Sequence, residues 1–295
     1  MAEENTNDFW FRKIGFYNNP FSIKPAPFDF RVFGQEDILD ELTYRVPAGT
    51  MSFVEGDLGT GKSTIMKHLI HKFRGKGKII FFSCNRINND LNIEQLLINK
   101  YGLFGKMFKV HPKDMLVFLD EAQELSAENT ERIKYFFDHG NIKSVVFTGT
   151  DYEEVKFHES IKERIGEDGL LRVNALKEDD AIALIRDRIG NLNILSDEMI
   201  KKVWNLAKKN PRRLLQKCDK ACKYVVDNGD LEFTEEHLKK VFDEKSEIKE
   251  EKKKADNSPK KKLSSKKKKD DEKKEKAKEI EEDPEENLYE ADEEI

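Results

Sequence analysis

Residues 51–63 read MSFVEGDLGTGKS, and this stretch decides the fold. A short apolar run leads into a glycine-rich loop, and Gly56 to Ser63 match the pattern GxxxxGK[ST]. In such a loop the backbone amides turn inward around a phosphate, and the following helix adds its positive N-terminal end. Phosphate contacts are expected from Gly56, Asp57, Leu58, Gly59, Thr60, Gly61, Lys62, Ser63 and Thr64. Lys62 should reach the terminal phosphates and the Ser63 hydroxyl should coordinate magnesium. The alternative is a glycine-rich turn that matches by chance.

A second apolar run, MLVFL at residues 115–119, is followed by Asp120 and Glu121. This order places two carboxylates at the C-terminal end of a buried strand, where open parallel sheets bind their ligands. We expect Asp120 to hold magnesium through water and Glu121 to polarise an attacking water as a general base. Read alone, the two acids would be surface residues or helix N-caps.

Strand and helix patterns alternate along the chain, which predicts an α/β fold with a parallel sheet between helices. The expected strands are residues 51–56, 78–84, 115–119, 143–148 and 170–173. The expected helices between them are 36–46, 62–73, 93–101, 127–138 and 152–165, and after residue 175 only helices follow, at 177–189, 196–208, 211–228 and 234–244. We therefore predict an extended N-terminal arm (1–35), an αβα core (36–174) and a small helical lid (175–245).

The remaining residues, 246–295, are Lys-rich and then acidic, with too few apolar side chains to offset chain entropy, so we predict a disordered tail. Outside this tail the charges nearly cancel, which argues against a protein whose whole surface binds nucleic acid. The apolar runs are too short to cross a bilayer, and the acidic N-terminus lacks the features of a signal peptide. Three cysteines are better read as reduced thiols than as a disulfide framework. We expect a cytoplasmic protein without membrane insertion.

The loop, the segment DEAQEL at residues 120–125 and the helical lid together resemble the AAA+ P-loop ATPases of the ExeA-like and origin-initiator groups. The segment NPF, from Asn19 to Phe21, and FGQED, starting at Phe33, are similar to the part that lies against adenine in this family. The resemblance therefore implies ATP, with magnesium, as the bound nucleotide.

The resemblance also implies roles for three polar residues. Thr148, at the end of a strand, matches a polar sensor near the terminal phosphate. Arg164 stands where the family places an arginine that enters a neighbouring subunit, which implies a homo-oligomer or a hetero-oligomer with another AAA+ subunit. Arg212 matches the lid arginine that reports the nucleotide state, although Arg213 could serve instead. A surface helix arginine is the simpler interpretation of Arg164.

Two departures from the family weaken the transfer of a precise role. The stretch at residues 102–114 is short where relatives often carry another helix, and no winged-helix domain follows the predicted lid. The leading hypothesis is an AAA+ ATPase that hydrolyses ATP to drive switching or assembly on DNA or a nucleoprotein. The alternatives are a nucleotide-gated adaptor with little turnover and an accessory ATPase of a membrane secretion-type assembly. The acidic C-terminus could in addition dock on a basic protein partner.

Overall fold

The computed structural model describes residues 9–23, 31–74, 79–84, 92–100 and 112–242. The chain divides into two compact units, Met1–Val241 and Phe242–Ile295, and all but one of the described residues belong to the first. The predicted tail at 246–295 lies outside the described residues.

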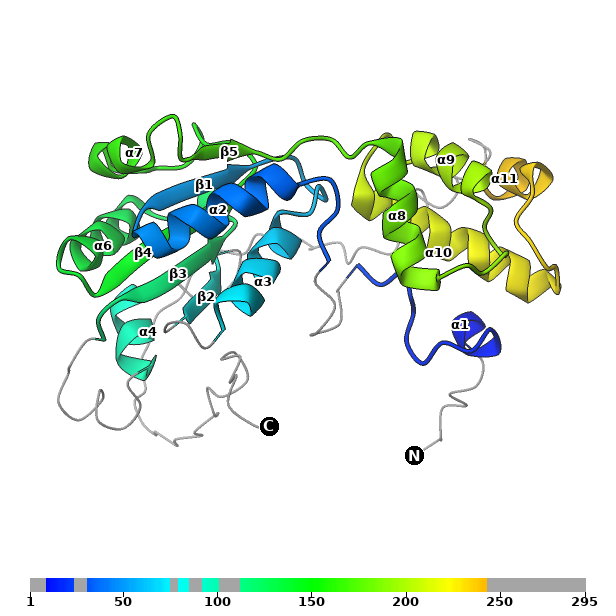
Figure 1. The fold of residues 1–295 in the computed structure, drawn as a ribbon, viewed down its shortest axis with the longest axis horizontal. Coiled ribbons are helices and arrows are strands. Elements are labelled where there is room, and N and C mark those ends of the chain that lie inside the picture. Colours follow the sequence, from blue (N-terminus) through cyan, green and yellow to red (C-terminus); the bar gives the residue numbers. More distant parts are fainter. Residues whose placement is uncertain (1–8, 24–30, 75–78, 85–91, 101–111, 243–295) are drawn as a thin grey trace, which may run out of the picture. The chain divides into compact units, whose positions relative to one another are not determined.

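A parallel five-stranded sheet forms the centre of the core, as predicted (Figure 1). Its strands are β1 (Met51–Glu55), β2 (Ile79–Ser83), β3 (Met115–Asp120), β4 (Ile142–Gly149) and β5 (Leu170–Arg172). They lie in the order β2-β3-β4-β1-β5. β1 and β3 are thus separated by β4, and the loops that follow these two strands emerge at the same carboxyl edge of the sheet.

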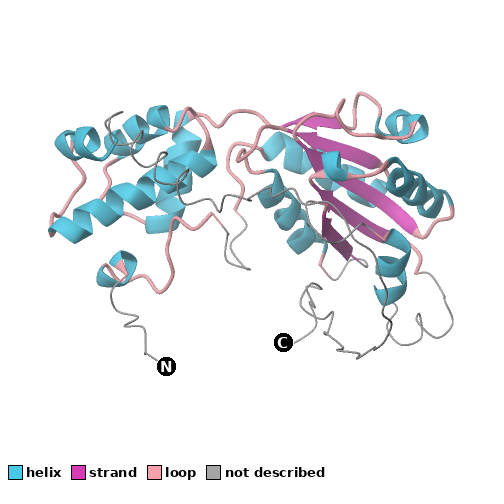
Figure 2. Cartoon of the chain, turned by 180° about the vertical axis from the view of Figure 1, so that it is seen from behind, coloured by secondary structure: helices cyan, strands magenta, loops and turns pink. Residues whose placement is uncertain are grey.

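Helices cover both faces of the sheet (Figures 1 and 2). One face is packed by α2 (Glu36–Ala48) and α3 (Lys62–Phe73), and the other by α4 (Ile93–Lys100), α6 (Ala127–Asp138) and α7 (Glu159–Ile165). Because successive strand residues point to opposite faces, β3 contributes Leu116 and Phe118 to one core, and Met115, Val117 and Leu119 to the other. Every residue of β3 is buried, which explains the unbroken apolar run in its sequence.

One predicted helix is wrong over its first half. We expected helix from residue 152, but α7 begins at Glu159. The Tyr152 N–H donates to the Glu55 carboxylate (2.9 Å), a partner on β1 that helical spacing does not reveal. Residues 153–154 form a turn in which the Val155 N–H donates to the Tyr152 carbonyl (3.3 Å), and the side chains of Val155 and Phe157 are buried in the core. His158 caps the short helix by accepting from the Ser160 N–H.

The lid consists of α8 (Glu178–Ile189), α9 (Asp197–Leu206), α10 (Pro211–Asn228) and α11 (Glu235–Phe242). Ser196 and Asn210 accept hydrogen bonds at the N-termini of α9 and α10, so side-chain caps set both helix starts. A short additional helix, α1 (Trp10–Lys13), lies against α10 within the predicted arm. Of the helices in the described ranges, none combines the length and apolar character needed to span a bilayer.

Candidate nucleotide-binding site

A cavity of about 260 Å³ lies where the glycine loop, the end of β3, the arm and the lid meet. The lining includes seven consecutive loop and helix residues, Leu58, Gly59, Thr60, Gly61, Lys62, Ser63 and Thr64, together with Asp120, Glu121, Phe33 and Arg212. Residues from four distant segments, each singled out in the sequence, therefore surround one space. Gly56 and Asp57 are not among the described residues that line the cavity, and their carbonyls accept hydrogen bonds from the Lys62 side chain.

The loop at residues 56–63, called the P-loop below, presents a positive end to the cavity. Gly61 adopts a left-handed conformation (φ 106°) at the start of α3, and no side chain caps this helix. The Thr64 N–H already donates to the Gly61 carbonyl (2.9 Å), which leaves the N–H groups of Lys62 and Ser63 to face an anion. Lys62 is buried (8 % exposed) and donates to the carbonyls of Gly56 (2.5 Å) and Asp57 (3.0 Å). Burial lowers the pKa of the Lys62 ammonium, while the nearby carboxylates of Asp120 and Glu121 act in the opposite direction.

Asp120 connects the P-loop to the sheet. Its Oδ2 accepts from the Ser63 hydroxyl at 2.6 Å, and its Oδ1 accepts from the Thr148 hydroxyl and from the Glu121 N–H at 3.1 Å. Thr148 is fully buried beneath the cavity at the end of β4 and does not line it. A carboxylate and a hydroxyl oxygen side by side form the hard oxygen donor pair that magnesium prefers, so these residues fit the ion.

Glu121 leaves β3 in the left-handed conformation (φ 59°), which is uncommon for a residue with a side chain. Its N–H is fixed between Asp120 Oδ1 and Thr148 Oγ1 (3.4 Å). Its carboxylate Oε2 is buried and has no hydrogen-bond partner within the described ranges. A buried acceptor without a partner is costly, and Glu121 is also one of the residues that line the cavity.

Apolar side chains line the opposite end of the cavity. The arm contributes Ile23, Val32 and Phe33, and the lid side contributes Leu176, Leu184 and Leu215. Gln35 closes this end: its Nε2 donates to the Asn174 carbonyl (2.7 Å) and its Oε1 accepts from the Asn174 N–H (3.2 Å). A flat apolar ring system fits between such walls. The cavity is therefore polar and cationic at the P-loop and apolar at the arm, as a nucleotide requires.

Comparison with known proteins agrees with this geometry. The family profile described as AAA domain matches residues 49–175, from two residues before β1 to the segment that precedes α8. Residues 49–175 are therefore similar to an AAA domain. No curated protein matches the sequence.

Solved structures resemble the chain over most of its length at low identity, which shows the fold. The Orc1 protein of Aeropyrum pernix, solved in complex with DNA, has a TM-score of 0.60 and 14% identity, over 78% of this chain and 69% of that one. The Cdc6p of Pyrobaculum aerophilum has a TM-score of 0.57 and 13% identity, over 75% and 69%. The RuvB Holliday junction branch migration motor of Thermotoga maritima has a TM-score of 0.54 and 15% identity, over 71% and 68%.

The arm attaches to the lid differently from our expectation. Asn19 and Phe21 are absent from the cavity lining within the described chain. The Asn19 side chain donates to Asp219 on α10 (2.7 Å), which also accepts from the Trp10 indole (3.2 Å). Phe21 is buried and stacks on Trp10, with ring centroids 6.1 Å apart. These residues fasten the arm to α10, and of the expected adenine contacts only Phe33 reaches the cavity.

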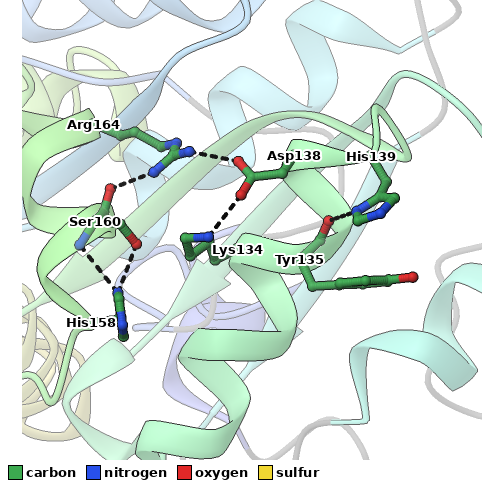
Figure 3. Close-up of polar contacts among 7 residues, drawn as sticks. All are labelled: Lys134, Tyr135, Asp138, His139, His158, Ser160 and Arg164. Carbon is green, nitrogen blue, oxygen red and sulfur yellow. Dashed lines mark hydrogen bonds and ion pairs between the residues drawn. The ribbon is translucent and has the colours of Figure 1, made fainter.

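Arg164 is held by contacts within its own chain, as Figure 3 shows. Its Nη2 pairs with Asp138 Oδ1 on α6 (2.6 Å), and its Nη1 donates to the Ser160 carbonyl (2.8 Å). Asp138 also accepts from Lys134 (2.9 Å). The hydrogen bond from Lys134, and then the charge of Arg164, lower the pKa of Asp138. Within the described ranges, Arg164 is not among the residues that line the cavity.

The lid supplies the predicted Arg212 and also two residues that the sequence analysis missed, Arg188 and Asn210. Arg212 lines the cavity, whereas the N–H of Arg213 donates to the side chain of Asn210 (3.1 Å). Arg188 on α8 also lines the cavity and donates to the carbonyls of Pro20 (3.3 Å) and Ser22 (3.4 Å) of the arm. Asn210 could have been found, because Asn before a Pro is a common start of a helix. The role of Arg188 depends on contacts that are distant in sequence.

Proposed function

We propose that the chain binds magnesium-ATP in this cavity and hydrolyses it to ADP and phosphate. The observation that carries the proposal is the arrangement at the end of β3. Glu121 lines the cavity and holds a buried carboxylate oxygen that has no partner within the described ranges, next to an Asp120 that Ser63 and Thr148 hold in place. Fixed donors and acceptors of this kind supply most of the catalysis in phosphoryl transfer.

In this mechanism Lys62 and the first turn of α3 bind the terminal phosphates. Ser63 and Asp120 would hold magnesium, which when bound neutralises charge on the phosphates. Glu121 orients a water molecule and accepts its proton while the water oxygen bonds to the terminal phosphorus. The bond from that phosphorus to the ADP oxygen breaks, and the electron pair leaves with ADP. Arg212 would stabilise charge on the phosphates from the lid side.

The likeness to other AAA structures supports a nucleotide-driven action on a partner. We propose a nucleic acid or nucleoprotein partner, because one similar structure contains DNA and another is a branch migration motor. The core at 36–174 would hold the phosphates, the lid at 175–245 would respond to them, and the arm at 1–35 would close the base end. Arg164 would act on the site of a neighbouring subunit in an oligomer.

One observation favours a second candidate, a nucleotide-gated adaptor with little turnover. Arg164 is paired with Asp138 in its own chain. If this pair persists in every assembly, the site lacks the arginine that the family places there, and ATP binding would serve as a switch without rapid hydrolysis.

Turnover by the purified protein distinguishes these candidates, measured as phosphate release with and without single- and double-stranded DNA. Glu121→Gln should lower kcat by about a hundredfold or more, because loss of a general base typically costs 10²–10⁴ in rate. Glu124→Gln is the matched control, since this exposed acid lies three residues along and outside the cavity. Equal rates for wild type and Glu121→Gln would contradict the hydrolytic mechanism, and tight ATP binding without turnover would favour the adaptor.

A further inference from the structure

The first turn of α10 rests directly on the P-loop. The Arg212 N–H donates to the Gly59 carbonyl (3.2 Å), and the Asn210 side-chain Nδ2 donates to the Leu58 carbonyl (2.9 Å). The other amide atom of Asn210, Oδ1, accepts from the Arg213 N–H and caps the helix. The Asn210 side chain therefore makes two contacts: Oδ1 caps the N-terminus of α10, and Nδ2 binds the P-loop.

The approach of α10 leaves no room for a side chain at Gly59. A Cβ built there would lie 2.8 Å from Arg212 Cβ and 2.8 Å from Asn210 Oδ1. A Cβ at Gly61 would meet nothing within 4 Å. Glycine is thus required at the two positions for different reasons. Gly61 is required by its left-handed backbone (φ 106°), whereas at Gly59 (φ 85°) a side chain would in addition collide with the lid helix.

The turn that delivers Asn210 is strained. Lys208 and Lys209 both have a φ of 54°, and consecutive left-handed residues with side chains cost roughly 1–2 kcal/mol each. Hydrogen bonds from their N–H groups to the carbonyls of Asn205 (3.0 Å) and Trp204 (3.3 Å) hold the turn, and Trp204 is buried in the lid. The surrounding lid therefore enforces a backbone that places Asn210 at the P-loop.

Peptide geometry gives this contact a consequence for phosphate binding. In a trans peptide the C=O of one residue and the N–H of the next point in opposite directions. When Asn210 holds the Leu58 carbonyl, it also directs the Gly59 N–H away from itself, and Gly59 lines the cavity. Inward-facing N–H groups of this loop are what bind phosphate.

We propose that Asn210 is a positioning residue that sets the orientation of the Leu58–Gly59 peptide for phosphate and couples the state of the P-loop to the first turn of α10. This inference rests on the proposed binding of ATP in the cavity. Because coupling between sites is reciprocal, a nucleotide that changes the P-loop must also change the hydrogen-exchange protection of the first turn of α10. For the same reason, loss of the Asn210 side chain must lower the affinity for the nucleotide.

Two substitutions separate this role from simple helix capping. Asn210→Ser keeps a good N-cap oxygen but has no second amide atom to reach the Leu58 carbonyl, whereas Asn210→Ala loses both contacts. Ser126→Ala is the matched control, because Ser126 caps α6 in the same way, by accepting from the Asn129 N–H, and lies outside the cavity lining. It loses a helix cap without touching the P-loop.

The experiment measures magnesium-ADP and magnesium-ATPγS binding by calorimetry, and hydrogen exchange at residues 211–215 with and without each nucleotide. We expect Asn210→Ser and Asn210→Ala to weaken binding roughly three- to tenfold, the effect of one lost hydrogen bond. Both should lose the nucleotide-dependent change in exchange that the wild type shows, while Ser126→Ala keeps it.

The outcomes differ for the two proposals. Wild-type affinity and wild-type exchange in Asn210→Ser would overturn the role of Asn210 while leaving ATP binding intact. A defect in Asn210→Ala without one in Asn210→Ser would also overturn this role, since loss of the helix cap would then explain the whole effect. A wild-type protein that binds neither nucleotide would overturn the proposed function itself and this inference with it.

Discussion

Replacing Thr148 by valine tests whether a buried hydroxyl organises the candidate site. Thr148→Val keeps the shape of the side chain but removes the donor to Asp120 Oδ1 and the acceptor for the Glu121 N–H. Asp120 Oδ1 retains only the Glu121 N–H, at 3.1 Å. A buried hydrogen bond to a charged group contributes about 1.5–3 kcal/mol, so the free energy of unfolding should fall by about 2 kcal/mol.

For a folded unit of this size, such a loss lowers Tm by about 4–8 °C. Calorimetry or urea unfolding measures it, and phosphate release measures the accompanying loss of turnover. Thr148→Ser is the matched control, because it keeps the hydroxyl and loses a buried methyl group, at about 1 kcal/mol. The hydroxyl argument predicts that valine impairs turnover more than serine. If serine is the more damaging change and valine leaves turnover intact, Thr148 serves packing and the reasoning is refuted.

Three further predictions concern the turn before α10, the thiol beside the site and the arm. Lys209→Gly should raise the unfolding free energy by about 0.5–1 kcal/mol, because glycine adopts φ 54° without strain; urea unfolding that shows a loss would refute the strained turn. Burial, with the charge of Asp120, raises the pKa of Cys84 to about 12, so its maleimide labelling at pH 8 should be on the order of a thousandfold slower than that of a free cysteine. The Cys84 rate should still rise tenfold per pH unit between about pH 8 and 10, where an unfolded thiol levels off; mass spectrometry of the labelled peptide gives both rates, and a plateau in the folded protein would contradict the shift. Asp219→Ala should lower the free energy of unfolding in urea by about 1–3 kcal/mol, since it leaves the buried Trp10 indole without its acceptor. Asp227→Ala, at an exposed position on the same helix, should lower it little. Equal losses would contradict the role of Asp219 in attaching the arm to α10.

Local sequence determined the elements that carry their own start and stop signals. The helices at 62–73, 127–138 and 211–228 were predicted to the residue, because each has helical spacing of apolar side chains and begins at a glycine loop, a serine cap or an Asn-Pro pair. The parallel sheet and the meeting of P-loop and β3 acids followed from the alternation of strands and helices.

Contacts between distant segments could not be predicted in this way. The error at 152–158 concerns a segment whose Tyr152 N–H binds Glu55 on another strand and whose Val155 and Phe157 side chains pack into the core, contacts that helical spacing does not reveal. Likewise the NPF segment has no local feature that reveals its acceptor, since Asp219 lies 200 residues away from Asn19. Sequence patterns indicated the phosphate end of the cavity, which is built from contiguous motifs, and left the base end, which the arm and lid build together, largely undefined.

The pairing of Asp138 with two cations bears on how readily Arg164 can change partners. Arg164 is one-third exposed in this pair, and exposed ion pairs typically contribute about 0–1 kcal/mol. When Arg164 swings away, Lys134 still accompanies the carboxylate at 2.9 Å, so no lone acid is left behind. Breaking the Arg164–Asp138 pair therefore costs little free energy. An interface that places a phosphate near Arg164 could draw this side chain away from Asp138 at the cost of only a small fraction of the interface's binding free energy.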